Sequence, residues 1–281
     1  MCEKQEKRMN KINQEDYKVF EKSEKLGVVG TIDDRGDPHL SLLTTIMAKG
    51  DQEMVVGQFT KGLSKLYMQE RNKCGFAIMG LDMNFWTGTM NWKDVKTEGE
   101  EFVKYNNMQM WRFNTYFGIY QVHYFELVNI SEKRKLDIPK VACNAVRCMA
   151  SKPFLKYAGK EEVLRPYARK LFNAVGNPKF ISFINEEGYP VVVPAVQAQE
   201  VGTNTIVLTS SPYKELFTSL KKGARVAMMA ISLEMESVVI KGTFSGFNGG
   251  VGRVKIDRVY NSIPPVMRYI YPFDDFTVPK I

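Results

Sequence analysis

The chain has 281 residues, a formal net charge of +8 and 44% hydrophobic residues, enough apolar material for two ordinary cores and too much for wholesale disorder. The longest uninterrupted apolar run, Val191 to Val196, cannot span a bilayer, and the charged first 25 residues lack the apolar stretch of a signal peptide. We therefore expect a cytoplasmic protein with no membrane partner.

The first half of the chain predicts a helix followed by short strands. Asn13 to Lys25 has apolar residues at helical spacing and ends before Gly27. Further helices are expected over 62–71 and 98–112. The expected strands, rich in aliphatic residues and separated by turn signals, are Val28–Ile32, Leu40–Met47, Met54–Gln58, Cys74–Met79, Asn84–Met90 and Tyr116–Ile130.

The second half predicts the same order of elements. A helix over 161–174 ends at Gly176-Asn177-Pro178, and a short helix is expected over 213–220. Residues 249–252 lack the spacing of a nucleotide-binding loop and predict a hairpin turn. Many short strands favour a barrel, because closure removes exposed strand edges. The expected strands are 180–185, 191–199, 205–209, 225–231, 236–244 and 252–260.

An internal repeat connects the two halves. Residues 31–38 read Thr-Ile-Asp-Asp-Arg-Gly-Asp-Pro, and residues 183–190, 152 positions later, read Phe-Ile-Asn-Glu-Glu-Gly-Tyr-Pro. Residues 85–90 and 239–244 each carry an internal Gly-Thr. Such a repeat indicates two copies of one domain. We predict a first domain over 1–130, a basic connector over 131–160 and a second domain over 161–281.

The positive charge is concentrated near the connector. Residues 131–170 hold eleven Lys or Arg against four acidic residues, a net +7. A nucleic-acid interface would place basic residues among aromatics on a sheet or along a recognition helix. This stretch has neither pattern, so we expect a solvated helical face and no nucleic-acid partner.

Cysteine and histidine usage predicts no metal site. The four cysteines form no CxxC pair or Cys/His cluster, and the only histidines are His39 and His123. We expect reduced thiols with packing roles. His39 falls in a predicted turn. His123 alternates within a predicted strand, where packing is the expected role and haem ligation the alternative.

The junction between the third strand and the next helix is the best candidate for a binding site. In the first copy it reads Gln58-Phe59-Thr60-Lys61-Gly62-Leu63-Ser64-Lys65. Two hydroxyls and two ammonium groups surround a helix start, where free N–H groups and the helix dipole favour an anion such as phosphate. Helix capping by Thr60, or by Ser211 in the second copy, explains the same residues. Both interpretations stay open.

The order of these motifs resembles the FMN-binding split-barrel superfamily, which includes pyridoxamine 5′-phosphate oxidase. The resemblance rests on a Val-Val-Gly-Thr-Ile-Asp strand, a Gly-x-Pro turn and a Thr…Ser-Lys helix start, and covers about 25–90 and 177–247. It implies a mainly β fold with helices (α+β class): two split β-barrels in tandem, each preceded by a helix and joined by a helical basic connector.

The resemblance also implies an FMN flavoprotein that acts as an oxidase or reductase on a small-molecule redox substrate. The substrate-binding Arg and His pattern of pyridoxamine 5′-phosphate oxidase is not evident, so the substrate is not implied. The flavin phosphate would lie near Ser64 and Lys65, with Thr60 and Lys61 as neighbours. The ring and ribityl chain would lie along the second strand at Leu43, Thr44, Thr45 and Ile46, with Gln58 as a further contact.

Other expectations follow from the resemblance. Pro212, Tyr213 and Glu215 interrupt the second junction, so that copy is expected to bind weakly or stay empty. Flavin in this superfamily lies between two barrels, which implies barrel–barrel packing within the chain or a homodimer of first copies. The alternative function is a non-catalytic binding or regulatory module that holds haem, a deazaflavin or no cofactor.

Overall fold

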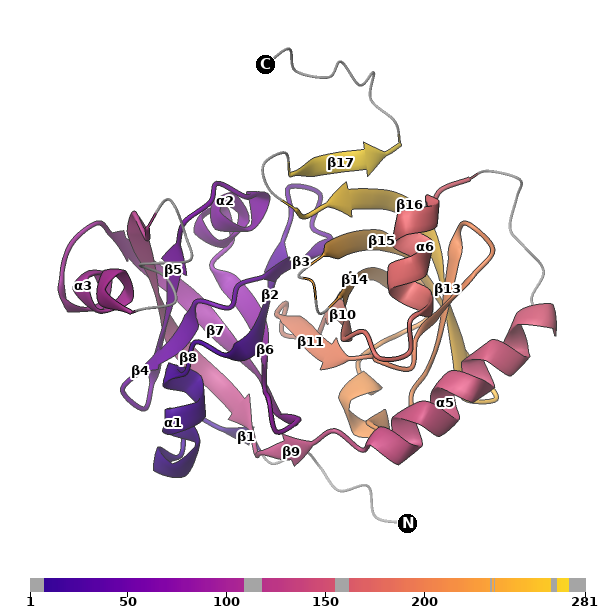
Figure 1. Ribbon diagram of the computed structural model, residues 1–281, viewed down its shortest axis with the longest axis horizontal. Helices are drawn as coiled ribbons and strands as arrows, with labels where there is room; N and C mark the ends of the chain where they lie inside the picture. The colour runs from indigo at the N-terminus through magenta and orange to yellow at the C-terminus, as the bar shows by residue number, and fades with distance from the viewer. Residues whose placement is uncertain are drawn as a thin grey trace. The chain divides into compact units, whose positions relative to one another are not determined.

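The computed structural model describes residues 8–108, 118–154, 162–232, 234, 236–263 and 267–272. These residues form two antiparallel sheets with helices, so the expected mainly β, α+β duplication is confirmed (Figure 1). One compact unit comprises Met1–Leu136 and Asn185–Val192, and the other Asp137–Ile184 and Val193–Ile281. The domain limits inferred from the sequence stay predictions. No helix in the described part of the chain is long and apolar enough to cross a membrane.

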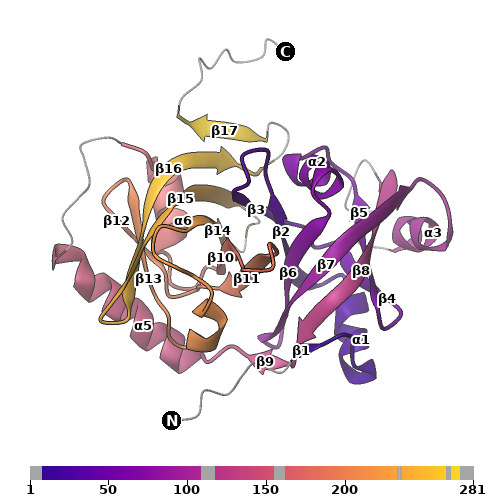
Figure 2. The same ribbon diagram turned by 180° about the vertical axis from the view of Figure 1, so that it is seen from behind.

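The first sheet follows the order β3-β2-β6-β7-β8-β5-β4, and Figure 2 shows its strands from behind. Short strands β1 (Arg8–Met9) and β9 (Arg134–Lys135) pair with β8 and β7. The helices are α1 (Gln14–Glu21), α2 (Leu63–Glu70) and α3 (Glu100–Asn107). The main strands are β2 (Lys25–Ile32), β3 (Pro38–Leu42), β4 (Ile46–Lys49), β5 (Glu53–Gln58), β6 (Lys73–Gly80), β7 (Asn84–Lys96) and β8 (Gln121–Ser131).

The second sheet repeats this order as β11-β10-β14-β15-β16-β13-β12, with β17 (Arg268–Tyr271) on β16. The connector is helical, as expected, and forms α5 (Ile138–Ser151) and the single turn η1 (Lys152–Phe154). The remaining elements are α6 (Pro166–Asn173), β10 (Lys179–Ile184), β11 (Pro190–Pro194), β12 (Gln199–Val201), β13 (Thr205–Thr209), η2 (Lys214–Phe217), β14 (Arg225–Ile231), β15 (Ser237–Asn248) and β16 (Val251–Asn261).

Backbone hydrogen bonds reproduce the sequence repeat. The amide of Asp33 donates to Asp37 O at 2.9 Å, and 152 residues later the amide of Asn185 donates to Tyr189 O at 2.9 Å. The side chains of these two residues make the same hydrogen bond. Asp33 Oδ1 and Asn185 Oδ1 each accept from the backbone N–H of the residue four positions later. Each hairpin is therefore closed by the same pair of backbone and side-chain hydrogen bonds, made by an Asp in the first copy and an Asn in the second.

The strand ladders correct one part of the sequence match. Ala77 pairs with Thr87 in the first sheet, and Met229 pairs with Val239 in the second. The offset of 152 therefore continues through these strands. The two Gly-Thr dipeptides that the sequence comparison aligned are two positions out of register.

A turn interrupts the strand predicted over Leu40–Met47. Leu43 N donates to Gly27 O at 2.7 Å and Ile46 N donates to Leu43 O at 3.0 Å, so the chain leaves β3 and restarts as β4. The strand predicted over 191–199 breaks in the same way. The two ends of the strand path, β3 and β4, are thus joined by only three residues, and the sheet must curl to bring them together. No ladder joins β3 to β4 in the described residues, so the barrel is not closed by hydrogen bonds.

Three predicted helices differ in their limits. Residues 98–112 contain α3, which ends at Asn107, and Trp111 lies outside the described residues. The helix predicted over 161–174 begins only at Pro166, a residue that suits the first turn and cannot donate within it. The helix predicted over 213–220 is the short 3₁₀ turn η2.

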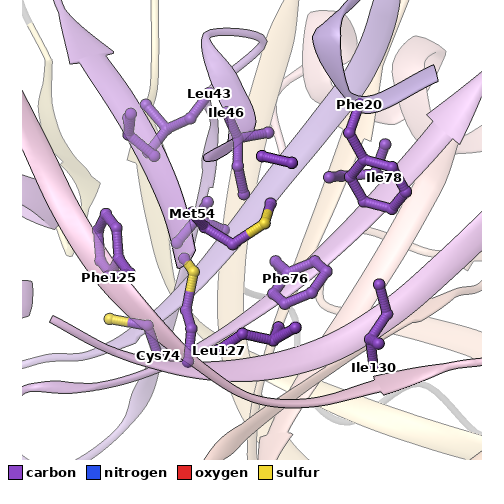
Figure 3. Close-up of a cluster of buried hydrophobic side chains, with 14 of the residues drawn as sticks. Phe20, Leu43, Ile46, Met54, Cys74, Phe76, Ile78, Phe125, Leu127 and Ile130 are labelled. Carbon is purple, nitrogen blue, oxygen red and sulfur yellow. The ribbon is translucent and has the colours of Figure 1, made fainter. Parts of the chain in front are cut away.

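The larger apolar cluster of the first sheet lies between the curled strands and α1 (Figure 3), and a second, smaller cluster includes Tyr105 of α3 and Val122 of β8. The largest ring of the larger cluster, Trp86, packs edge-on against Phe20 with ring centroids 5.2 Å apart, and its Nε1–H donates to Asp16 at 3.0 Å. Figure 3 labels Phe20, Leu43, Ile46, Met54, Cys74, Phe76, Ile78, Phe125, Leu127 and Ile130.

We expect Gly88→Ala to destabilise the protein by about 1–3 kcal/mol. A Cβ at Gly88 would lie 2.4 Å from Asn129 O and 2.5 Å from Phe76 Cζ, and neither the strand nor the packed ring can move freely. Gly176→Ala is the control, because a Cβ there meets nothing within 4 Å. Urea unfolding of both variants measures the difference. Equal midpoints would contradict the prediction.

Candidate functional site

Helix α2 begins directly after the β5 junction, and no side chain caps it. Its N-cap is Gly62, and no side-chain hydrogen bond closes the cap in the described structure. The η2 turn of the second copy, whose N-cap is Tyr213, also has no side-chain cap. Capping by Thr60 or Ser211 is therefore not what these residues do. The hydroxyl-rich junction of the first copy needs another explanation.

Lys65 lies in the first turn of α2 and is 7% exposed. Among the described residues, no hydrogen bond or ion pair to its ammonium is recorded, and burial lowers the pKa of Lys65 to about 8. Ser64 beside it is 1% exposed. A buried cation without a counter-charge is costly unless an anion joins it. This position fits a phosphate group.

A histidine lies close to Lys65 and is held by two side chains. The indole Nε1–H of Trp92 donates to His123 Nδ1 at 3.1 Å. An indole nitrogen only donates, so Nδ1 accepts and the ring proton lies on Nε2, which is 2.7 Å from Gln58 Oε1. Burial, reinforced by the Lys65 ammonium, lowers the pKa of His123 to about 4. The ring is therefore neutral at physiological pH.

The Gln58 carboxamide connects this histidine to the junction. Its Oε1 also accepts from Gln121 Nε2, and its Nε2 donates to Thr60 O at 3.0 Å. Strand pairing explains the arrangement, because Gln58 of β5 lies opposite Gln121 of β8, and His123 is two residues along the same face. Three strands thus converge on the loop that leads into α2.

The structure brings together some of the predicted flavin contacts and separates others. Gln58, Ser64 and Lys65 are buried around the junction, with Thr60 half-buried and Lys61 exposed. The remaining predicted contacts, Leu43, Thr44, Thr45 and Ile46, form the turn between β3 and β4.

That turn leaves little for a ring to contact. Leu43 and Ile46 point their side chains into the core (Figure 3), and their backbone N–H groups close the turn itself. Thr45 Oγ1 donates to Gly57 O at 2.7 Å, and only Thr44 is partly exposed. The described residues therefore fit a phosphate better than they fit a flavin ring, and the ring contacts stay a prediction.

Helix α3 supports the same turn. The Tyr105 hydroxyl donates to Thr45 O and lies 3.2 Å from Val55 O. Asn106 holds the start of the returning chain, because its side chain donates to Ile119 O at 2.9 Å and accepts from Ile119 N at 3.0 Å. The second copy has a tight hairpin between the equivalent strands, so this support belongs to the first copy alone.

Sequence reasoning did not include Trp92, Gln121 and His123 in the site. Gln121 and His123 alternate in a predicted strand, which placed them on one face, but only the register against β5 brings that face to Gln58. Trp92 comes from a third strand, β7, and its indole donates to the histidine.

The second copy lacks the histidine. In the first sheet Val56 pairs with His123, and in the second Leu208 pairs with Gly252. Because Leu208 follows Val56 by 152 residues, Gly252 occupies the histidine position. A Cβ at Gly252 would lie 2.7 Å from a Phe244 ring carbon, so even a small side chain is excluded there.

Aromatic rings replace the other polar groups of the site. With the same offset, Phe217 stands at the position of Lys65, and Phe244 at that of Trp92. Phe247 contacts both, with ring centroids 5.8 Å from Phe217 and 4.9 Å from Phe244. This apolar cluster has no group that could neutralise a phosphate.

The described residues hold no group of three or more His, Cys, Asp or Glu side chains that could bind a metal ion. Both ring nitrogens of His123 are hydrogen-bonded, so iron ligation would require breaking one of these bonds. His39 is buried with its ring edge-on to Tyr67, at a centroid distance of 5.4 Å.

Comparison with known proteins found neither a matching family model nor a matching curated protein. Solved structures similar to parts of the chain include Group A Streptococcus HupZ, at 16% identity over 44% of this chain and 96% of that chain, with a TM-score of 0.36. A putative pyridoxamine 5′-phosphate oxidase from Lactobacillus delbrueckii has 15% identity over 43% and 94% of the two chains, with a TM-score of 0.35. An FMN-binding protein from Syntrophomonas wolfei has 15% identity over 39% and 77%, with a TM-score of 0.33. Two of these three structures are thus named as an FMN-binding protein and as a putative pyridoxamine 5′-phosphate oxidase, the kinds of protein that the sequence motifs resemble.

Proposed function

We propose that the first copy of this chain binds FMN and that the protein is an FMN-dependent oxidoreductase. The observation that supports this proposal is the buried Lys65 ammonium, which has no recorded acidic partner among the described residues and lies at the start of α2. Ser64 and the first N–H groups of α2 would donate to the phosphate, and Lys65 would neutralise it.

The arrangement favours a ligand with a terminal phosphate. A phosphate monoester carries nearly two negative charges at neutral pH, enough to compensate a buried ammonium and to use several N–H donors. Bound FMN would supply the hydride or electron transfer, and the chain would bind and orient it. Because His123 is neutral, Lys65 is the buried positive charge that the ligand would meet.

The absorption spectrum of the protein as purified tests the cofactor. We expect the two visible bands of oxidised flavin, and heat-released cofactor that has the mass of FMN. A Soret band would indicate haem, and a released deazaflavin would indicate a different cofactor of similar shape. Either result, or a colourless protein that FMN does not bind, would contradict the proposal. Anaerobic mixing with reduced nicotinamide then tests whether the bound flavin accepts hydride.

We expect one FMN per chain, because the second copy has Phe217 where the first has Lys65. Titration of the flavin-free protein, followed by quenching of flavin fluorescence, measures the stoichiometry. Phe217→Leu is the matched control and should leave both stoichiometry and affinity unchanged. Two equivalent sites per chain would show that the aromatic cluster does not prevent binding.

A further inference from the structure

We infer that His123 is a positioning residue for the phosphate-binding junction: its ring, oriented by Trp92, holds the Gln58 carboxamide, which in turn holds the backbone at Thr60. The inference rests on the proposed function, since it concerns how the same site is kept ready for the phosphate of FMN. In this inference His123 acts through Gln58 and does not itself contact the cofactor.

The orientation of the imidazole is determined by its first partner. Trp92 can only donate, at 3.1 Å from Nδ1, so the ring N–H must lie on Nε2. That N–H is 2.7 Å from Gln58 Oε1, which makes the carboxamide oxygen the acceptor. Because Gln58 Oε1 accepts from both His123 and Gln121, the NH₂ group of Gln58 points away from the histidine and toward Thr60.

The Gln58 amide nitrogen holds the backbone of the junction. It donates to Thr60 O at 3.0 Å, two residues before the Gly62 N-cap of α2. The backbone of Gln58 is also held, because its carbonyl accepts from Tyr120 N at 3.0 Å. The loop between β5 and α2 is therefore attached to β7 and β8 through side chains, and not only through its own strand.

The second copy provides an internal comparison. Glycine replaces this histidine, phenylalanine replaces Trp92, and Ser210 replaces Gln58. Its junction leads into the 3₁₀ turn η2 instead of an α-helix. The copy without the Trp92–His123–Gln58 hydrogen bonds thus also lacks the α-helical turn whose N–H groups would bind a phosphate.

A positioning role predicts selectivity between two ligands. Riboflavin has the ring and ribityl chain of FMN but no phosphate, so the junction should matter little for it. In metal sites, loss of an outer residue that orients a ligand typically reduces affinity about ten- to a hundred-fold, and we take the same range for this site. We expect His123→Leu to weaken FMN binding by about this factor and riboflavin binding by less than about threefold.

Conservative variants separate positioning from packing. His123→Gln keeps an acceptor for Trp92 and a donor for Gln58, so it should restore most of the FMN affinity. Trp92→Phe removes the indole donor, keeps an aromatic ring and frees the imidazole of His123 to turn, so it should lower FMN affinity while leaving riboflavin affinity unchanged. In a double-mutant cycle, the protein with both His123→Leu and Gln58→Leu should lose little more FMN affinity than the protein with either change alone.

The experiment is a titration of FMN and of riboflavin into the full-length protein and these variants, with thermal unfolding to confirm that each is folded. If the wild-type protein binds neither flavin, the proposed function fails. If the wild-type protein binds FMN, and the variants weaken the binding of both flavins equally or of neither, the positioning role is overturned. If His123→Leu does not fold, Trp92→Phe and His123→Gln decide the same question.

Discussion

Replacing Lys65 by methionine is expected to weaken FMN binding about ten- to a hundred-fold, because one charge-assisted contact to the phosphate is worth about 1.5–3 kcal/mol. The neighbouring Ser64 and the backbone N–H groups would remain, so binding should be reduced and not abolished. Methionine is close to lysine in length and can fill the same space without the ammonium.

The same substitution is expected to stabilise the protein without ligand. Burial lowers the pKa of Lys65 from its ordinary 10.5 to about 8, so keeping the ammonium charged in the folded state costs free energy. Each pKa unit corresponds to about 1.4 kcal/mol, and an apolar side chain would remove this cost. We expect the free energy of unfolding to rise by about 1–3 kcal/mol. A residue that lowers stability in the absence of ligand is typical of a binding site.

Two measurements on each variant check these results: an FMN titration, and thermal unfolding of the flavin-free protein. Lys214→Ala is the control, since this exposed lysine lies in the junction of the second copy. It should change neither quantity. Equal losses of FMN affinity in the two variants would contradict the assignment of the site to the first copy. A less stable flavin-free Lys65→Met protein would contradict the view of Lys65 as an uncompensated charge.

FMN affinity is expected to fall about ten- to thirtyfold between pH 7.5 and pH 9.5. In the free protein Lys65 loses its proton around pH 8, whereas a bound phosphate would hold that proton to higher pH. Between these two pKa values each unit of pH costs up to a tenfold loss of affinity. His123, with its pKa lowered to about 4, is neutral throughout this range and does not contribute.

The stability of the flavin-free protein should change with pH in the opposite direction. The pKa of Lys65 is lower in the folded state than in the unfolded state, so between about pH 8 and 10.5 the unfolded chain binds more protons. Stability from this group therefore increases as pH rises, and Lys25 and Lys179, whose pKa values are lowered to about 8 and 7, act in the same direction.

Titrations at several pH values, in wild type and in Lys65→Met, test the affinity profile. The variant should show no slope above pH 8, because it has no ammonium to titrate. A slope of the same size in both proteins would assign the pH dependence to another group. Below about pH 6 the phosphate takes up its second proton, so affinity should also fall there in the wild type.

Much of the fold could be predicted from the sequence because its signals are local. Gly and Pro at the hairpins, with Asp33 and Asn185 as turn formers, indicated where strands end, and their recurrence indicated the duplication. Short aliphatic runs between turn signals placed β13 and β14 at their observed limits. The junction before α2 was identified for the same reason, since a run of hydroxyl and ammonium groups at a helix start can be read from consecutive residues.

The tertiary structure alone decided which residues share the site and what each one does. Only the pairing of β5 with β8 brings His123 to Gln58, and only the packing of β7 directs Trp92 onto the ring. The turn at 43–45 depends on Gly27 of another strand accepting its hydrogen bond, a contact that local preference cannot indicate. Such contacts join residues distant in sequence through strand register, and one-residue changes in register reverse which face each side chain occupies. The sequence by itself therefore determined the repeat and the junction, whereas the structure determined that Lys65 is buried and that an aromatic cluster takes its place in the second copy.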